Sequence, residues 1–411
     1  MDNITHTLIG ALVGEAAASR RTARVSADDV RGRNFLVWIS AIGSNLPDCD
    51  VLYTALAHEK LNYILEHRGY THTILGAIVA GLLIFAGAML FARQHRWTLS
   101  RNDRWRIGAM SFFTPLLHIG MDFTNNYGVH PFWPWNNAWF YGDSIFIIEP
   151  FLWAACAPLA FTLRSVAGRI LVGIVLVASI VLPVVTGLVP IPAVFAIATA
   201  SGLLLWLART KHTAAVLSGL ACWLLVTGCF AAGHAQAVNS AAQISHDQFP
   251  EQHLLDAVLT PLPANPFCWE TLFVQADDRN LTVRRAMMSV MPSVIDAARC
   301  PARSLDRRIT APIAAVDAEN SVQLKWYGET QTALSRLRAL DQSDCDVAGL
   351  LRFARAPWSA VVDDRRVVGD LRFDREPSLG FAEIEALGHT SCRTSAPWLP
   401  PRADILGSEK P

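Results

Sequence analysis

The sequence predicts a mainly α-helical membrane protein: a polytopic bundle of about eight apolar segments, followed by a C-terminal soluble α+β domain. Of the 411 residues, 52% are hydrophobic and only 17% are charged, against about 25% charged in ordinary soluble domains. The long apolar segments all precede residue 243, and short strand-like runs follow it. We therefore divide the chain into a membrane domain, residues 1–242, and a soluble domain, residues 243–411.

Charge separates the same two parts. The first 242 residues contain 16 basic residues (Lys and Arg) and 12 acidic residues (Asp and Glu). Residues 243–411 contain 19 basic and 23 acidic residues. Neither part carries the basic patch that typifies nucleic-acid-binding proteins. The sequence therefore predicts a lipid bilayer as the partner of the first domain and no nucleic acid.

The membrane domain contains eight apolar segments. The first is shorter than the roughly 20 residues that a span requires, and the second is broken by a turn at residues 45–48. A proline-rich hairpin at residues 190–192 joins the sixth to the seventh. The segments are Ile4–Ala18, Phe35–Ala57, Thr71–Ala92, Ile107–Met121, Ile147–Leu163, Ile170–Val189, Ile191–Ala208 and Ala214–His234.

The basic residues predict an orientation. Fourteen of the 16 lie in the loops that follow the first, third, fifth and seventh segments, and only Lys60 and Arg68 lie elsewhere. Short loops rich in Lys and Arg stay in the cytoplasm. The N-terminus and the soluble domain are therefore expected outside the cytoplasm. The first ten residues lack the features of a cleaved signal peptide, so we expect the segments themselves to direct insertion.

The loop at residues 123–146 contains no Lys or Arg and is dense in aromatic residues. Such density beside membrane spans is typical of an interfacial belt, and a wall of a substrate site is the alternative. The aromatic residues are Phe132, Trp133, Trp135, Trp139, Phe140 and Tyr141.

Four cysteines lie in the soluble domain: Cys268, Cys300, Cys345 and Cys392. An even number suits an oxidising compartment and up to two disulfides. Their pairing stays open. The absence of a Cys-x-x-Cys pair argues against a structural zinc site in this domain.

The α+β prediction for the soluble domain rests on its local patterns. Residues 277–280 and 363–366 are typical of hairpin turns, and Thr332–Leu340 and Val347–Phe353 are typical of helices. The strand-like runs are residues 271–275, 282–287, 322–327, 361–362 and 367–373.

The candidate site begins with His118 and Asp122, four residues apart on a predicted helix and so on one face. The pair alone could be an ordinary polar helix end. Three further clusters, DNITH, LPDCD and HRGYTH, end on the same side of the predicted bundle. The candidate metal ligands are His6, Asp48, Asp50, His67, His72, His118 and Asp122.

Energetics favour a metal at this cluster. An ionisable side chain within a membrane helix costs about 2.5–3.5 kcal/mol, and a divalent ion compensates several of them at once. Imidazole and carboxylate ligands predict one or two ions, with zinc preferred. A hydrogen-bonded polar cluster or a proton path is the alternative. Asp48 alone could be a turn residue, and Arg68 either an interfacial anchor or a phosphate contact.

Four motifs in this order resemble the YdjM-like family of bacterial inner-membrane metal-dependent hydrolases. They are DNITH, NLPDCD, HRGYTHTILG and HIGMDFTNNYGVHPFWP continuing to YGDSIFIIEP, within residues 1–150. The resemblance implies a multi-pass protein of the bacterial inner membrane with metal-dependent hydrolase activity. It covers neither the later segments nor the soluble domain.

A more distant similarity is to zinc-dependent phospholipase C and the single-strand-specific zinc nucleases. It implies that Asp48 or Asp50, His67 or His72, His118 and Asp122 hold one ion. It further implies that His6 and Asp122 hold a second, with Asp122 bridging. Those enzymes also use an N-terminal amine and later ligands that have no counterpart in the motifs of this sequence.

The sequence hypothesis is a membrane hydrolase in which a metal-activated water attacks an ester or phosphoester, with a lipid at the outer membrane face as the favoured substrate. Asp48 or Asp50 would act as ligand or general base, and Arg68 would contact a phosphate. An ion or proton transporter is one rival, although residues 170–208 contain no Asp, Glu, His or Lys. The other rival is a non-catalytic scaffold whose metal staples four helices.

Overall fold

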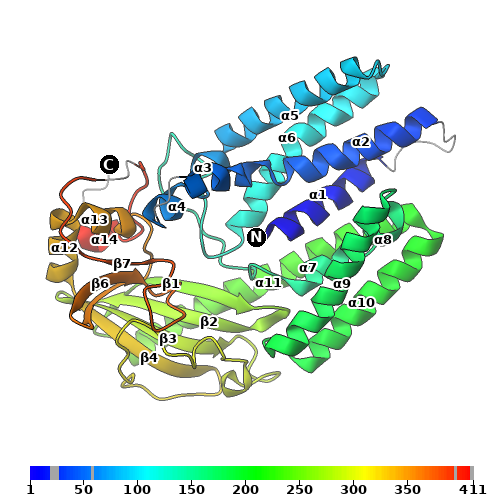
Figure 1. The fold of residues 1–411 in the computed structure, drawn as a ribbon. Coiled ribbons are helices and arrows are strands. Elements are labelled where there is room, and N and C mark those ends of the chain that lie inside the picture. The colour runs from blue at the N-terminus through cyan, green and yellow to red at the C-terminus, as the bar shows by residue number, and fades with distance from the viewer. Residues whose placement is uncertain (19–26, 57–59, 393–395, 408–411) are drawn as a thin grey trace.

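The computed structural model describes residues 1–18, 27–56, 60–392 and 396–407. Helices fill the N-terminal part of the chain, and an antiparallel sheet with small helices forms the C-terminal part (Figure 1). The mainly α-helical class and the C-terminal α+β domain are thus confirmed.

The first group of helices carries the motifs. Helix α1 packs against α2, α2 packs against α6, and α6 packs against α5. Short elements connect α2 to α5 and hold the LPDCD and HRGYTH sequences. The elements are α1 (Asn3–Ala18), α2 (Ala27–Gly43), η1 (Leu46–Cys49), α3 (Asp50–Leu56), α4 (Lys60–Glu66), η2 (Tyr70–His72), α5 (Ile74–Gln94) and α6 (Arg101–Phe123).

Local chemistry sets the ends of these helices. Pro47 lies in the first turn of η1, where its missing N–H costs nothing. The Thr73 hydroxyl accepts a hydrogen bond from the Gly76 amide and caps α5. Ser100 and Asp103 form a reciprocal capping box at the start of α6.

The crossing of α1 and α2 requires a glycine. A Cβ atom on Gly10 would lie 2.4 Å from Ser44 Oγ and 2.7 Å from the Ser40 carbonyl oxygen. Small residues at such a contact let two helix backbones approach closely. This crossing brings His6 of α1 within reach of the turn that follows α2.

The second group of helices follows the aromatic loop. The hairpin predicted at residues 190–192 joins α9 to α10. The elements are α7 (Pro150–Ala155), α8 (Leu159–Thr162), α9 (Val166–Thr186), α10 (Ile191–Thr210) and α11 (His212–Gln248).

The expectation of about eight apolar segments is not confirmed. Among the described residues, four helices are long and apolar enough to cross a membrane by length and composition: α5, α9, α10 and α11. Helices α1 and α2 have only 16 and 17 residues, α6 begins with a charged turn, and the predicted fifth segment is split into α7 and α8. Arg20, Arg21 and Arg24 of the first predicted basic loop lie outside the described residues.

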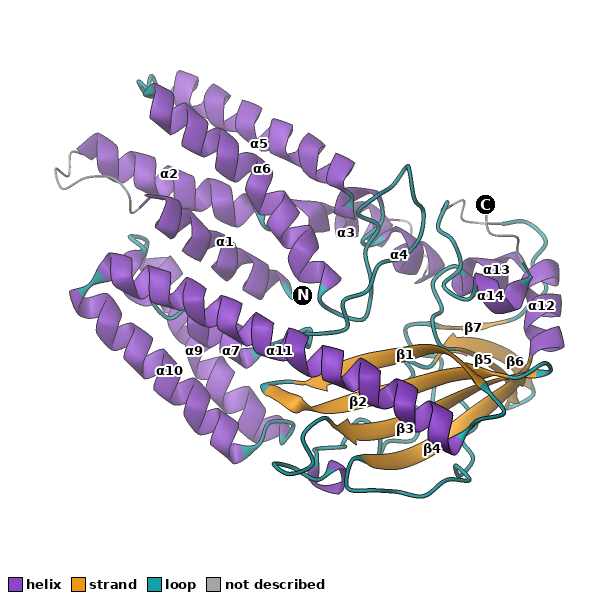
Figure 2. Ribbon diagram, turned by 180° about the vertical axis from the view of Figure 1, so that it is seen from behind, coloured by secondary structure: helices purple, strands orange, loops and turns teal. Residues whose placement is uncertain are grey.

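Helix α11 joins the two parts of the molecule. It has 37 residues, and residues 242 and 243, where the sequence divides the domains, lie inside it. Its second half lies across the sheet in Figure 2, and Ala237 and Ala241 pack against Trp269 and Phe273. A continuous helix, rather than a loop, thus leads from the apolar part into the sheet domain.

The C-terminal domain has two antiparallel sheets. The first has the order β1-β2-β3-β4 and the second β5-β6-β7. Both predicted turns are confirmed, and Asp363 and Asp364 adopt positive φ angles of 48° and 61° between β5 and β6. The elements are β1 (His253–Leu262), β2 (Asn265–Ala276), β3 (Asn280–Ser289), η3 (Ala297–Arg299), β4 (Leu324–Ala333), α12 (Leu334–Ser343), α13 (Cys345–Leu351), β5 (Pro357–Val362), β6 (Arg365–Asp370), β7 (Glu383–Glu385) and α14 (Ala403–Leu406).

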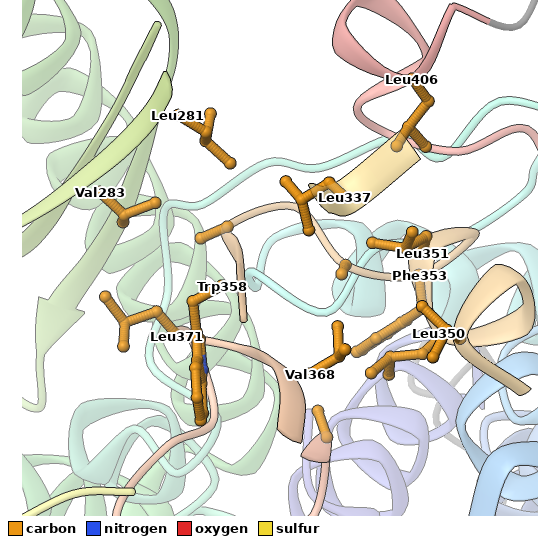
Figure 3. Packing of buried hydrophobic residues seen from close by; sticks show 14 of the residues in the cluster. Leu281, Val283, Leu337, Leu350, Leu351, Phe353, Trp358, Val368, Leu371 and Leu406 are labelled. Atoms are coloured by element: carbon orange, nitrogen blue, oxygen red, sulfur yellow. The ribbon is translucent and has the colours of Figure 1, made fainter. Parts of the chain in front are cut away.

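The main core of this domain also anchors the N-terminal part. Trp358, Phe353, Leu350 and their neighbours pack together in Figure 3. Leu61, Ile64 and Leu65 of α4 belong to the same cluster, and the Trp398 indole donates to the Leu65 carbonyl at 2.6 Å. The short helix between the LPDCD and HRGYTH motifs is therefore held by the C-terminal domain.

The cysteines of the C-terminal domain form two disulfides, Cys268–Cys300 and Cys345–Cys392. The first links β2 to the end of η3, and the second links α13 to the segment that follows β7. The expectation of up to two disulfides is confirmed, and the structure supplies the pairing that the sequence left open.

Candidate metal centre

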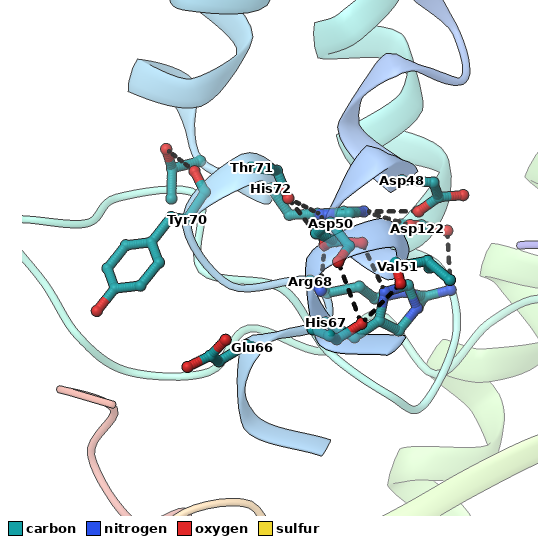
Figure 4. Close-up of polar contacts among 12 residues, drawn as sticks. Asp48, Asp50, Val51, Glu66, His67, Arg68, Tyr70, Thr71, His72 and Asp122 are labelled. Carbon is teal, nitrogen blue, oxygen red and sulfur yellow. Dashed lines mark hydrogen bonds and ion pairs between the residues drawn. The ribbon is translucent and has the colours of Figure 1, made fainter. Parts of the chain in front are cut away.

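Four of the predicted ligands converge on one buried point. Asp48 comes from η1, His72 from η2, and His118 and Asp122 from successive turns of α6 (Figure 4 shows the Asp48, His72 and Asp122 side chains). The two imidazole Nε2 atoms lie 3.0 Å apart. His72 Nε2 lies 3.2 Å from Asp48 Oδ1 and 3.0 Å from Asp122 Oδ2. His118 Nε2 lies 3.4 and 3.2 Å from the same two oxygens.

These distances match the size of a metal site. Zinc–nitrogen and zinc–oxygen bonds of about 2.0–2.1 Å place tetrahedral ligands about 3.3 Å apart, and five of the six pairs lie at 3.0–3.4 Å. Among the described residues, Asp48 Oδ1 has no hydrogen-bond donor although it is buried. Two nitrogens and two carboxylate oxygens that face one another suit a divalent cation, so the residues present fit the predicted group.

Surrounding groups orient both histidines. His118 Nδ1 lies 2.7 Å from the Ser44 carbonyl oxygen, so it donates there and leaves Nε2 as the free lone pair. His72 Nδ1 lies 3.4 Å from Asp50 Oδ2 and 3.0 Å from the Thr71 hydroxyl. Both Nε2 atoms therefore point at the common centre in the tautomer that a metal requires.

Asp50 lies outside the four-residue group. Its carboxylate accepts from the Arg68 amide at 2.9 Å and the Thr71 hydroxyl at 2.8 Å, and it lies 3.0 Å from His67 Nδ1. A carboxylate so occupied orients the ligand histidine rather than replacing it. Asp48, Asp50 and His67 do form a second, three-residue group within ligand distance, so Asp48 belongs to both groups.

His6 lies on the other side of Asp122. Its Nε2 is 3.1 Å from Asp122 Oδ1, and its ring stacks on that of His118 with centroids 3.8 Å apart. Asp122 thus lies between His6 and the other three residues of the four-residue group. The Arg68 guanidinium also lies 3.1 Å from Asp122 Oδ1, and the nitrogen of Met1 contacts the same oxygen. The charge of Arg68 opposes a second metal beside His6 and favours one ion.

Arg68 is part of this centre. It is 4% exposed, donates to Asn125 Oδ1 at 2.8 Å, and its Nε has no partner among the described residues. Its backbone φ of 60°, rare for a residue with a Cβ, directs the amide to Asp50. An arginine so enclosed does not reach outward as the interfacial-anchor interpretation requires.

The electrostatics follow from these contacts. Burial disfavours the charged form of His72, but interactions with the nearby carboxylates of Asp122, Asp48 and Asp50 outweigh it and raise the pKa of His72 to about 10. Burial likewise opposes ionisation of Asp50, but hydrogen bonds from His67 and His72 outweigh it and lower the pKa of Asp50. Without a metal, His72 carries the compensating positive charge. A metal must displace that proton, so its affinity is expected to fall with falling pH.

The structure adds residues that the motif analysis passed over. Ser44 orients His118 through its carbonyl oxygen, and Thr71 contacts His72 and Asp50 through its hydroxyl oxygen. The spacing of residues in the sequence does not indicate such contacts. Asn125 lies within the quoted motif HIGMDFTNNYGVHPFWP, and its amide oxygen accepts a hydrogen bond from Arg68. In the aromatic loop, Trp135 is exposed as a belt residue would be, but Trp139 is buried and its indole donates to the Arg352 carbonyl at 2.7 Å.

Comparison with known proteins agrees with the motifs. The family model of the YdjM inner membrane protein matches residues 1–190. The uncharacterized protein YfhP of Bacillus subtilis (strain 168) is 28% identical over 156 residues, which are 37% of this chain and 43% of that protein. The match thus spans less than half of that relative. No solved structure matches the chain. The first 190 residues, which hold every residue of the candidate metal centre, are thus similar to the YdjM inner membrane protein family.

Proposed function

We propose that the protein is a membrane-bound metal-dependent hydrolase that cleaves an ester or phosphoester. The observation that supports this most is the unpartnered Oδ1 of Asp48, which lies 3.2 and 3.4 Å from two histidine nitrogens that are oriented as metal ligands. His72, His118 and Asp122 would hold the metal. Two histidines and one carboxylate form a ligand set of catalytic zinc sites.

Zinc suits this centre because its ligands are imidazole and carboxylate in a tetrahedral arrangement of the appropriate size. When bound, it would lower the pKa of a coordinated water toward about 7 and polarise the bond to be cleaved. The compactness of the four-residue group and the Arg68 guanidinium beside Asp122 Oδ1 support one ion per chain rather than two.

Asp48 and Arg68 complete the proposed chemistry. Asp48 is the most exposed of the four converging residues, at 8% for its side chain. Its free oxygen can accept a proton from the attacking water and return it to the leaving group. Arg68 carries a buried positive charge at the edge of the centre and can stabilise negative charge that develops on a phosphoryl or acyl oxygen. Asp50 positions His67 and His72.

The non-catalytic scaffold remains the second candidate. A specific observation favours it. With Asp48 included, the centre offers four protein ligands and no open position, which is typical of structural zinc sites. The two functions differ in the role of Asp48, which is a ligand in the scaffold and a base in the hydrolase.

Hydrolysis is tested on lipids. The metal-loaded wild type is incubated with bacterial lipid extract, and headgroup and acyl release are followed by mass spectrometry. We expect products from the wild type and none from Asp122→Ala, because that variant loses a ligand. Identical product profiles for the two proteins over a wide pH range would exclude lipid hydrolysis and leave the scaffold.

We further propose that the C-terminal domain lies outside the cytoplasm. The distribution of basic residues and the two disulfides support this. A reporter enzyme that is active only outside the cytoplasm should work when fused after Pro411 and fail within residues 95–101. Cys345 and Cys392 are partly exposed yet should react with a membrane-impermeant thiol reagent only after reduction. Reporter activity in the 95–101 loop alone would reverse the orientation.

A further inference from the structure

An open cavity of about 790 Å³ lies between the N-terminal part and the C-terminal domain. His67, Arg68 and Asn125 line it on the side of the metal centre. Because Arg68 contacts both Asp122 and Asn125, the cavity reaches the edge of that centre.

Another wall of the cavity is apolar. Ile145 and Ile147 precede α7, and Leu188 follows α9. Helices α9 and α10 are candidate membrane spans, and Leu188 lies in the turn between them. The apolar wall therefore begins where two spans end, at the level where acyl chains meet lipid headgroups.

The C-terminal domain lines the opposite wall with arginines. Arg303, Arg307 and Arg375 face the cavity, as does Arg372. Arg375 is paired with Glu270 at 2.9 Å, and Arg372 with Asp370 at 2.7 Å. Among the described residues, Arg303 and Arg307 have no carboxylate within 4 Å. Glu376 also lines the cavity, so the wall keeps a net positive charge.

Arg285 lies beside this wall without lining the cavity. It is on β3 and is 4% exposed, and its side chain has no hydrogen bond or ion pair in the part of the chain that the structure describes. It lines a small recess that shares Asn126, Thr260 and Glu270 with the cavity. Glu270 and Asp374 lie near enough to favour its charge, but neither is bonded to it, and a buried guanidinium without a bonded anion is costly. Its placement among other arginines therefore points to a negatively charged ligand.

We propose that this cavity binds a phosphate-bearing amphiphile. The arginines of the C-terminal domain that line the cavity bind the phosphate, with the charge of Arg285 behind them, and the apolar wall beside α9 holds the chains. Guanidinium groups suit phosphate because they donate paired hydrogen bonds in a plane. The inference rests on the proposed function, since it names the substrate class of the same site and assigns substrate binding to the C-terminal domain.

The test uses three matched probes and the full chain in a phosphate-free detergent. The probes are dihexanoyl phosphatidic acid, dihexanoylglycerol, which lacks the phosphate, and glycerol 3-phosphate, which lacks the chains. Affinities are measured by calorimetry on protein treated with a chelator. Binding to the arginines needs no metal, so an inactive or metal-free protein leaves this result intact.

Arg285→Gln and Arg307→Gln are each expected to weaken binding of dihexanoyl phosphatidic acid by about tenfold, as expected for loss of one charge-assisted contact. Arg307 is exposed, so its variant should fold even where the Arg285 variant does not. The control is Arg336→Gln on the exposed face of α12, which removes the same charge outside the cavity and should leave the affinity unchanged.

Unchanged affinity in both cavity variants, or equal binding of dihexanoylglycerol and dihexanoyl phosphatidic acid, would overturn the phosphate site. Glycerol 3-phosphate should bind the wild type at least about tenfold more weakly than the lipid, because it lacks the buried chains. Equal binding of the two phosphates would overturn the assignment to an amphiphile and identify a soluble phosphoester as the ligand.

Discussion

Alanine in place of His118 is expected to remove most of the bound divalent metal from the purified protein. His118 Nε2 lies within 3.4 Å of three other ligand atoms, so its loss opens one corner of the site. Asp122→Ala should have the same effect and should also leave His72 and Arg68 without their shared carboxylate. The affinity for zinc should fall by more than about 100-fold, beyond the 10–100-fold typical of groups that only orient ligands.

The measurement is elemental analysis of detergent-purified protein prepared without chelator, with about one ion per wild-type chain expected. His212→Ala is the matched control because this histidine lies exposed at the start of α11 and should leave the metal content unchanged. Asp50→Asn should weaken binding by about 10–100-fold and recover with excess zinc. A wild type that is fully folded and free of metal would contradict the metal centre.

Asp48→Asn is expected to lower the hydrolytic rate by a factor of about 10²–10⁴, the usual contribution of a general base, while zinc stays bound. Asparagine keeps the size and polarity of the side chain but cannot take up a proton. The fit of His72, His118 and Asp122 around the ion would be unchanged, because the contacts among these three do not involve Asp48.

This variant separates the two candidate functions. Metal content and turnover are measured on the same preparation, first as purified and then with added zinc. If Asp48→Asn loses its metal together with its thermal stability, Asp48 is a fourth structural ligand and the scaffold is correct. Full activity in the variant would remove Asp48 from the mechanism and direct attention to Asp50 and His67.

The sequence could indicate the four converging residues because they lie in short, regular contexts. His118 and Asp122 are four residues apart on a helix, and the Pro47 turn places Asp48 beside that helix. The sequence could not show which of these residues would bind the metal and which would orient the metal-binding side chains. Asp48 and Asp50 are chemically identical and two residues apart, and tertiary contacts such as those of Asp50 with the Arg68 amide and the Thr71 hydroxyl distinguish them.

The same limit applies to the rest of the fold. Strand β1 was not predicted because Asp256 and Pro261 interrupt its apolar pattern, yet an edge strand tolerates proline. The arginines of the cavity come from segments far apart in the chain, so no local pattern connects Arg68 with Arg285 or Arg307. Asp143, unremarkable by spacing, pairs with Arg355 at 2.7 Å and helps to fix the C-terminal domain against the aromatic loop.

Helix α11 fixes both the distance of the sheet domain from the apolar half of the helix and the rotation of that domain about the helix axis. Its 37 residues extend about 55 Å at 1.5 Å per residue, whereas the hydrocarbon core of a bilayer is about 30 Å thick. No flexible joint separates its apolar half from the half that carries the sheet. The number of helical residues between the two halves therefore determines where the cavity-lining arginines of the C-terminal domain lie relative to the membrane. Each residue gained or lost between the two halves would rotate the sheet by about 100°. The distance between the sheet domain and the membrane could therefore change in evolution only by near-integral turns.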